Sequence, residues 1–317
     1  DRKRSSVRTF AFAGFRVCFV FEFVRQHFTR EKTSVRPSVG LFLGRARRGP
    51  RRARARARLD RAGFLHDEVK LELEERLADV NRRFTAPVLI TPFVEYWADF
   101  MPEAPRVLPQ DDLGLTEGAH DLVIHAMALH WADDPVGQLV QAARALKPDG
   151  LFLGVFFGGE SLTELRDVLR QAEIAVMGGL SPRVAPMGDL RDMGGLLGRA
   201  GFALPVADTL RKTISYRDIF HLIGDLRDMG ETNVLDARHR AAPPRDLFTR
   251  ADEIYKKTYP FEENRIRSTV EIVFLSGWKP DASQQKPLRP GSAQARLADA
   301  LGVTEFDETA RPVENGS

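Results

Sequence analysis

The stretch 121–160 constrains the fold of this chain more than any other part of its sequence. It opens with a β-branched run, Asp121 to His125, which is typical of a buried parallel strand because such strands face apolar neighbours on both sides. Apolar residues then recur at helical spacing over 135–146, and a turn at Pro148-Asp149-Gly150 leads into a second apolar run, Leu151 to Phe157. The order strand, helix, parallel strand predicts a doubly wound α/β fold.

Local signals predict the neighbouring elements. Asp133 or Asp134 can cap the central helix, and Pro135 suits its first position. Ser161 and Glu164 have the spacing of a capping box, which predicts the start of the next helix. By similar rules we expect helices over 66–81, 95–101, 161–177, 190–200, 216–229 and 244–259, and strands over 87–91, 106–109, 204–210, 212–216 and 266–278.

The formal net charge of +3 conceals an asymmetry between the start and the rest of the chain. Residues 1–61 contain 18 lysines and arginines against 4 acidic residues, and 9 of the arginines lie between Arg45 and Arg61. Such a run can bind nucleic acid or an acidic membrane electrostatically. We interpret it instead as part of a solvated basic leader, and we expect no stable complex with nucleic acid.

Two features of the leader bear on location. The apolar run from Phe10 to Val24 is shorter than the roughly 20 residues that a membrane-spanning helix needs, and Arg16 and Glu22 interrupt it. The chain has one cysteine, Cys18, so a disulfide framework and a cysteine metal site are excluded. These features predict a cytoplasmic protein without a transmembrane segment.

The composition divides the chain into three expected parts. Residues 1–61 form the leader, residues 62–280 form one folded domain, and residues 281–317 form a polar, proline-rich tail.

Three motifs occur in a fixed order in the central stretch: His120-Asp121-Leu122-Val123, Leu129-His130-Trp131 and Arg144-Ala145-Leu146-Lys147-Pro148-Asp149-Gly150. Together they resemble the second half of class I S-adenosylmethionine-dependent methyltransferases. Four more segments resemble the branch of this superfamily that holds complex I assembly factor 5 and the malonyl-carrier-protein methyltransferases: Phe157-Gly158-Gly159-Glu160, Gly179-Leu180-Ser181-Pro182, Met229-Gly230-Glu231-Thr232-Asn233 and Arg289-Pro290-Gly291-Ser292-Ala293. The resemblance covers roughly residues 62–302.

This resemblance implies a methyltransferase that uses S-adenosylmethionine on a protein or carrier-bound acceptor, with a helical lid at about 217–262. His130 would act as a base or orient the acceptor, because it follows a central strand at the edge where doubly wound sheets bind ligands. The resemblance also implies cofactor contacts from Asp111, Asp112 and Leu129. It implies substrate contacts from Trp131, Gly158, Gly159, Glu160, Ser181, Glu231 and Asn233.

Structural roles are the alternative for several of these residues. His130 can pack against Trp131 to shape its loop, and Asp111 can belong to a solvated turn. Glu160 precedes a predicted helix, so its charge can serve the helix dipole alone.

The chain departs from the family where the cofactor loop belongs. Thr91-Pro92-Phe93-Val94-Glu95 stands in that place, and no glycine occurs between Arg83 and Gly114. Only glycines let the backbone turn tightly and approach the cofactor. About 30 residues separate Thr91 from Asp121, roughly half of what two complete strand-helix units require. The first half of the sheet is therefore expected to lack a unit.

Three functions remain open from the sequence. The first is methyl transfer. The second is a binding or assembly factor, of the respiratory complex I type, that keeps the fold without the cofactor. The third is an arginine-directed hydroxylase. Only the resemblance to the assembly-factor branch implies it, because the sequence has no 2-His-1-carboxylate spacing typical of a non-haem iron site. We predict no metal, and the acceptor and oligomeric state stay open.

Overall fold

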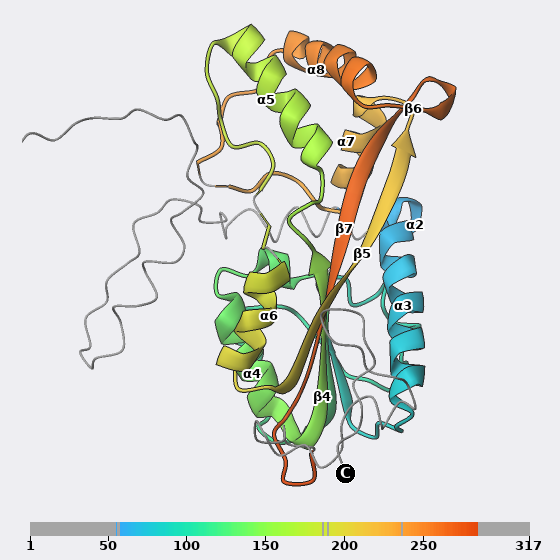
Figure 1. Cartoon of the computed structure of the whole chain (residues 1–317), viewed down its shortest axis with the longest axis vertical. Helices are drawn as coiled ribbons and strands as arrows, with labels where there is room; N and C mark the ends of the chain where they lie inside the picture. Colours follow the sequence, from blue (N-terminus) through green and yellow to red (C-terminus); the bar gives the residue numbers. More distant parts are fainter. Residues whose placement is uncertain (1–54, 56–57, 186, 189, 236, 285–317) are drawn as a thin grey trace, which may run out of the picture. The chain divides into compact units, whose positions relative to one another are not determined.

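A single seven-stranded sheet organises the described part of the chain, which comprises residue 55 and residues 58–284 except 186, 189 and 236. Figure 1 shows this computed structural model. The strands follow the order β2-β1-β3-β4-β7-β5, with β6 paired to β7. The parallel strands are β1 (Pro87–Ile90), β2 (Arg106–Val107), β3 (His120–Ala126) and β4 (Leu146–Phe157). The antiparallel strands are β5 (Ala203–Tyr216), β6 (Pro260–Phe261) and β7 (Arg265–Trp278).

Helices cover both faces of the sheet (Figure 1). One face carries α2 (Leu59–Ala62) and α3 (Phe64–Val80), and the other carries α4 (Pro135–Ala145) and α6 (Leu190–Arg199). Beyond one end of the sheet lie α5 (Thr163–Met177), α7 (Ile219–Asp228) and α8 (Arg245–Thr258). Two short 3-10 helices complete the described elements: η1 (Leu129–Trp131) and η2 (Glu262–Asn264). This arrangement confirms the predicted doubly wound α/β fold.

The central strands are apolar throughout because both of their faces are covered. On β3, Leu122 and Ile124 join the core under α3, whereas Val123 joins the core under α4 and α6. On β4, Leu153 joins the core under α3, and Phe152 joins the core under α4 and α6. A third core lies among α5, α7, α8 and the tip of the β5–β7 hairpin. The two helices between β5 and β7 thus have a core of their own, as a lid requires.

The start of α4 is as predicted. Asp134 is its N-cap, with the Asp134 side chain accepting a hydrogen bond from the Gly137 amide at 2.8 Å, and Pro135 is the first helical residue. We expect Asp134→Ala to lower the free energy of unfolding by about 1 kcal/mol, because one amide loses its only side-chain acceptor. Urea unfolding measures this change. A loss below about 0.3 kcal/mol would contradict the assignment of the cap.

The predicted helix over 95–101 is wrong, although two of its aromatic residues are buried. The segment forms successive turns, with Trp97 fully buried and Phe100 at 3% exposure. The guanidinium of Arg106 binds backbone carbonyls along this segment, and these carbonyls are then not available for a helical ladder. No helix joins β1 to β2 in the described chain, which agrees with the shortened first half.

Two other details differ from the sequence expectation. The strands expected over 204–210 and 212–216 form one strand, β5, that pairs with β7 along its whole length apart from a bulge between Ala203 and Val206. The capping box is wrong as well, since α5 begins after Leu162 with no side-chain cap. The Glu164 carboxylate instead accepts hydrogen bonds from the Thr269 amide at 3.0 Å and the Thr269 hydroxyl at 2.5 Å, which tie α5 to β7.

Most of the predicted leader and tail lies outside the described residues, including Cys18, the run from Phe10 to Val24 and the segment 285–317. The described chain contributes to the core before the expected boundary at residue 62, because Ala55 and Leu59 are fully buried. None of the helices described here has both the length and the apolar character to span a bilayer.

Candidate functional site

A cavity of about 230 Å³ lies between the end of the sheet and the lid. We call it the lid cavity. Its residues come from the segment after β3, from α5, from the loop that follows α5, and from the lid. They are His130, Trp131, Leu162, Leu165, Leu169, Arg183, Val184, Ala185, Met187, Ile223, Leu226, Arg227, Glu231, Thr232, Asn233, Val234 and Phe248. Four residues predicted as site residues from two distant motifs therefore share one cavity: His130, Trp131, Glu231 and Asn233.

The Glu231 carboxylate joins the two aromatic residues of η1. Trp131 Nε1 donates to Glu231 Oε1 at 3.0 Å, and His130 Nε2 lies 3.2 Å from the same oxygen. A carboxylate only accepts, so this contact places the ring proton of His130 on Nε2. His130 Nδ1 is buried without a hydrogen-bond partner among the described residues. That nitrogen is therefore the ring atom left to accept a proton.

Packing fixes the orientation of the His130 ring. It meets the Phe157 ring edge to face at a centroid distance of 5.2 Å and lies 5.5 Å from the Trp131 ring. The histidine thus has the packing role that the sequence left open, and it also lines the cavity. A ring held on three sides is suited to orienting a bound group, because little freedom is lost on binding.

Two loops close the cavity wall. Asn233 Nδ2 donates to the Pro182 carbonyl at 2.8 Å and so connects the lid to the loop after α5. In that loop the Arg183 guanidinium donates to the buried Glu173 carboxylate at 2.7 Å, and the Ser181 hydroxyl donates to the same carboxylate at 2.6 Å. Burial raises the pKa of Glu173, but the hydrogen bonds from Arg183 and Ser181 outweigh it and hold the pKa below its usual range. Ser181 therefore supports the wall and does not line the cavity.

The residues at the end of β4 do not reach the cavity. Glu160, expected to face it, is exposed and pairs with Arg211 at 3.0 Å. Gly158 packs against Glu271 so closely that a Cβ at Gly158 would lie 2.3 Å from the Glu271 carboxylate. Gly159 faces the backbone of the loop at Met187. Gly158 thus permits close packing between the end of β4 and β7.

The three residues predicted for the cofactor do not come together either. Asp111 and Asp112 lie exposed in the loop after β2, where the Asp111 carbonyl accepts from Gln141 Nε2 and the Asp112 carboxylate accepts from the Gly114 amide. Leu129 is buried in the core beneath α4. None of the three lines the lid cavity.

Several cavity residues were missed by the sequence analysis. Arg183 directly follows the Ser181-Pro182 motif, so its position in the sequence was a usable signal. Leu165, Leu169 and Ile223 carried no such signal, because apolar residues at helical spacing look the same whether they face a core or a cavity.

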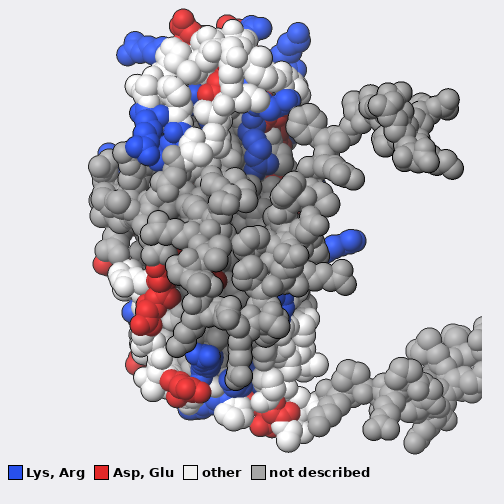
Figure 2. All heavy atoms as spheres, turned by 90° about the vertical axis from the view of Figure 1, so that its left-hand side faces the viewer, with Lys and Arg blue, Asp and Glu red and all other residues white. Residues whose placement is uncertain are grey.

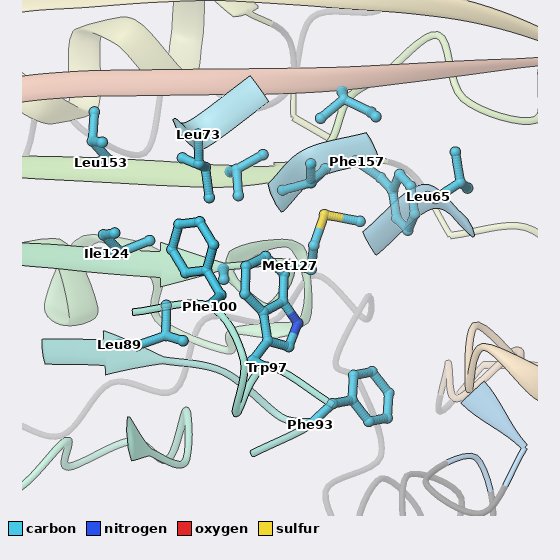
Figure 3. Close-up of a cluster of buried hydrophobic side chains, with 14 of the residues drawn as sticks. Leu65, Leu73, Leu89, Phe93, Trp97, Phe100, Ile124, Met127, Leu153 and Phe157 are labelled. Atoms are coloured by element: carbon cyan, nitrogen blue, oxygen red, sulfur yellow. The ribbon is translucent and has the colours of Figure 1, made fainter. Parts of the chain in front are cut away.

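The cofactor implied by the resemblance does not fit the residues at the carboxyl end of β1. Glycines would have to let the backbone approach it, but none lies between Arg83 and Gly114. Phe93 and Trp97 fill the space beside this strand end with exposures of 3% and 0% (Figure 3). The Phe93 amide donates to the Thr91 hydroxyl at 3.3 Å, so it is already paired within the chain.

Charge on the visible surface is mixed. Figure 2 shows basic and acidic side chains in separate small groups at both ends of the molecule. The described part of this face lacks the continuous basic stripe that tracks nucleic acid. Among the described residues, no group of three or more His, Cys, Asp or Glu side chains is arranged to hold a metal ion.

Comparison with known proteins gives one family. Residues 75–154 match the model of a methyltransferase domain. The chain is 40% identical over 194 residues to arginine-hydroxylase NDUFAF5, mitochondrial, of Dictyostelium discoideum, covering 61% of this chain and 44% of that protein. It is 32% identical over 181 residues to malonyl-[acyl-carrier protein] O-methyltransferase of Laribacter hongkongensis, covering 57% of this chain and 58% of that protein. The chain thus spans about half the length of these curated relatives.

Among solved structures, the YcgJ protein of Bacillus subtilis aligns with 68% of this chain and 100% of its own, at 15% identity and a TM-score of 0.42, which is a distant likeness. The methyltransferase-domain match runs from the second half of α3 through most of β4. By this match and by these curated relatives, the chain is similar to class I S-adenosylmethionine-dependent methyltransferases, in the branch that contains NDUFAF5 and the malonyl-[acyl-carrier protein] O-methyltransferases.

Proposed function

We propose that this chain binds a group carried by a protein partner in the lid cavity and acts on that partner as a binding or assembly factor. The observation that carries the proposal is the union of His130 and Trp131 with Glu231 and Asn233 in one cavity. A cavity of about 150 Å³ takes one benzene ring, so 230 Å³ suits a single side chain or the end of a carrier arm.

The lining suits an aliphatic stem with a polar head. Leu165, Leu169 and Ile223 offer apolar walls, and the Glu231 carboxylate stands beside His130 as an oriented acceptor. Arg227, exposed at the wall, offers a positive charge. The names of the relatives suggest two such groups. An arginine side chain would place its guanidinium at Glu231, and a malonyl group on a carrier protein would place its carboxylate near Arg227.

Two probes separate these groups in a titration calorimeter: an arginine-containing peptide and malonyl-carrier protein. If arginine is the group, we expect Glu231→Gln to weaken peptide binding about 10-fold or more, because a charge-assisted hydrogen bond becomes a neutral one while the shape is kept. If malonate is the group, Arg227→Gln should weaken carrier binding instead. Asp112→Asn, an exposed change outside the cavity, is the matched control. Absence of binding by both probes would overturn the proposal.

The second candidate is methyl transfer from S-adenosylmethionine to the same group. The family match favours it, and so does the position of His130, which can orient an acceptor or take its proton. Titration of S-adenosylmethionine and S-adenosylhomocysteine into the full chain decides between the two. Micromolar binding would favour transfer, and no heat at millimolar ligand would favour the binding role. The cytoplasmic location stays a prediction.

A further inference from the structure

The place where this sheet would take a ligand follows from its strand order. From β1 the chain adds β2 on one side, and β3 then pairs with the other side of β1. The topological switch point therefore lies between β1 and β3. Doubly wound sheets bind ligands in the crevice outside the carboxyl ends of the strands at this point. In this chain those ends lead into Thr91 and Met127.

Aromatic side chains of the chain itself fill this place. Figure 3 shows Phe93, Trp97 and Phe100 beside Met127, enclosed by α3. All four are at most 3% exposed. The Trp97 and Phe100 rings meet edge to face at a centroid distance of 5.5 Å. The crevice is thus closed by packed side chains from a single loop, Thr91 to Pro105, which we call the β1–β2 loop.

The buried polar atoms of this cluster are paired within the chain. Trp97 Nε1 donates to His66 Nδ1 at 3.2 Å, and the His66 ring meets the Phe93 ring edge to face at 5.3 Å. Burial lowers the pKa of His66 to about 4, with the nearby Glu231 raising it and His130 lowering it. At neutral pH His66 is therefore the uncharged acceptor that the indole requires, and this pair has no need of a ligand.

Side-chain hydrogen bonds to β2 and to α3 hold the β1–β2 loop in place. Arg106, on β2, donates to six backbone carbonyls of the loop at 2.7 to 3.3 Å, those of Trp97, Ala98, Phe100, Met101, Pro102 and Ala104. Lys70 on α3 donates to the Tyr96 carbonyl at 2.9 Å and to the Asp99 carboxylate at 2.7 Å. The Tyr96 hydroxyl donates to Asp67 at 2.6 Å. The loop is bound to both layers that would have to separate to admit a ligand.

We propose that the β1–β2 loop is a built-in occupant of the switch-point crevice, with Trp97 as the group that closes it, so that the fold is complete there without a nucleoside cofactor. This inference is independent of the proposed function, because none of the loop residues lines the lid cavity. The Trp97 indole then occupies the position where the resemblance would place the cofactor.

The first test uses the wild-type full chain in a thermal unfolding assay with S-adenosylhomocysteine. We expect no rise in Tm at millimolar ligand and no change in tryptophan fluorescence. Packed aromatic side chains fill the crevice, and hydrogen bonds hold the β1–β2 loop in place. A rise in Tm that Glu231→Gln does not alter would show that the loop gives way to the nucleoside, and this would overturn the inference. Failure of the lid-cavity probes leaves this result unchanged, so the two proposals fail separately.

The second test opens the crevice with Trp97→Gly, which leaves an indole-sized space. We expect a lowered Tm that added indole raises again, whereas S-adenosylhomocysteine does not raise it. Phe152→Gly, which removes a fully buried ring from the opposite face of the sheet, is the matched control and should gain less from indole. If Trp97→Gly unfolds, Trp97→Phe replaces it. A gain from indole in Trp97→Gly that is no larger than in Phe152→Gly would contradict the role of Trp97 as the group that closes the crevice.

Discussion

Asp121→Ala is expected to lower the free energy of unfolding by about 4 kcal/mol, since it removes a buried acceptor of three hydrogen bonds. The Asp121 carboxylate, at the start of β3, accepts from the Thr85 amide at 2.7 Å, the Thr85 hydroxyl at 2.8 Å and the Ala86 amide at 2.9 Å. These bonds align the entry to β1 with β3. Without the carboxylate, two backbone amides lose their partners where water has little access.

The same residue predicts a pH dependence. Burial raises the pKa of Asp121, but the hydrogen bonds from Thr85 and Ala86 outweigh it and hold the pKa below its usual range. A depressed pKa in the folded state means that the contribution is fully present above the unfolded value of about 3.9. The contribution is then lost as the pH falls through the lower pKa of the folded state.

Urea unfolding of the wild type and of Asp121→Ala at a series of pH values measures both effects. The difference between the two proteins should be constant near neutral pH and should shrink in acid. Asp112→Ala is the matched control, because its exposed carboxylate accepts a single local hydrogen bond and should cost less than about 1 kcal/mol. A difference between wild type and Asp121→Ala that grew in acid would contradict the assigned role.

Arg106→Met is the second change with a large expected effect, about 3 kcal/mol, because the guanidinium serves six carbonyls that no other side chain reaches in the described contacts. Methionine keeps much of the apolar stem and removes every donor. The β1–β2 loop should then loosen, with faster amide exchange over 97–104 than in the wild type.

Hydrogen exchange with mass spectrometry and urea unfolding measure the change at Arg106. Arg82→Met is the matched control. Arg82 is an arginine on the exposed surface, where it donates two hydrogen bonds to Asp149. It should cost less than about 1 kcal/mol. The free energy of unfolding of Arg106→Lys should fall between those of the wild type and Arg106→Met, because the single ammonium of lysine cannot reach all the carbonyls that surround the forked guanidinium. Unchanged exchange over 97–104 in Arg106→Met would show that the aromatic packing holds the loop without it.

The filled switch point and the lid cavity are separate features of this fold. The segment after β3 and the lid line the cavity of the proposed function, with His130 and Glu231 in contact. The side that would hold the cofactor is shortened and closed by Trp97. The two sides can therefore be tested one at a time, with Glu231→Gln acting on one and Trp97→Gly on the other.

The sequence by itself determined the central unit, because its signals are local. The runs at β3 and β4, the cap and Pro135 each depend on residues close in the chain. The two strands and Pro135 were predicted, and Asp134 was one of the two predicted caps, but β4 begins at Leu146, before the turn predicted at 148–150. The family motifs also predicted that His130, Trp131, Glu231 and Asn233 belong to one site. Their meeting in a single cavity is a result of the fold, but each of the two motifs marked two of these residues.

Only the tertiary structure decided the features that depend on distant partners. Glu164 looks like half of a capping box, yet Thr269, 105 residues away, takes its carboxylate. The segment 95–101 has the spacing of a helix, yet Arg106 binds its carbonyls and α3 binds its aromatic rings. Such choices turn on which partner a buried polar group meets once the layers pack. The spacing of residues along the chain does not specify that partner. The closed crevice and the lid cavity therefore follow only from the packed tertiary structure.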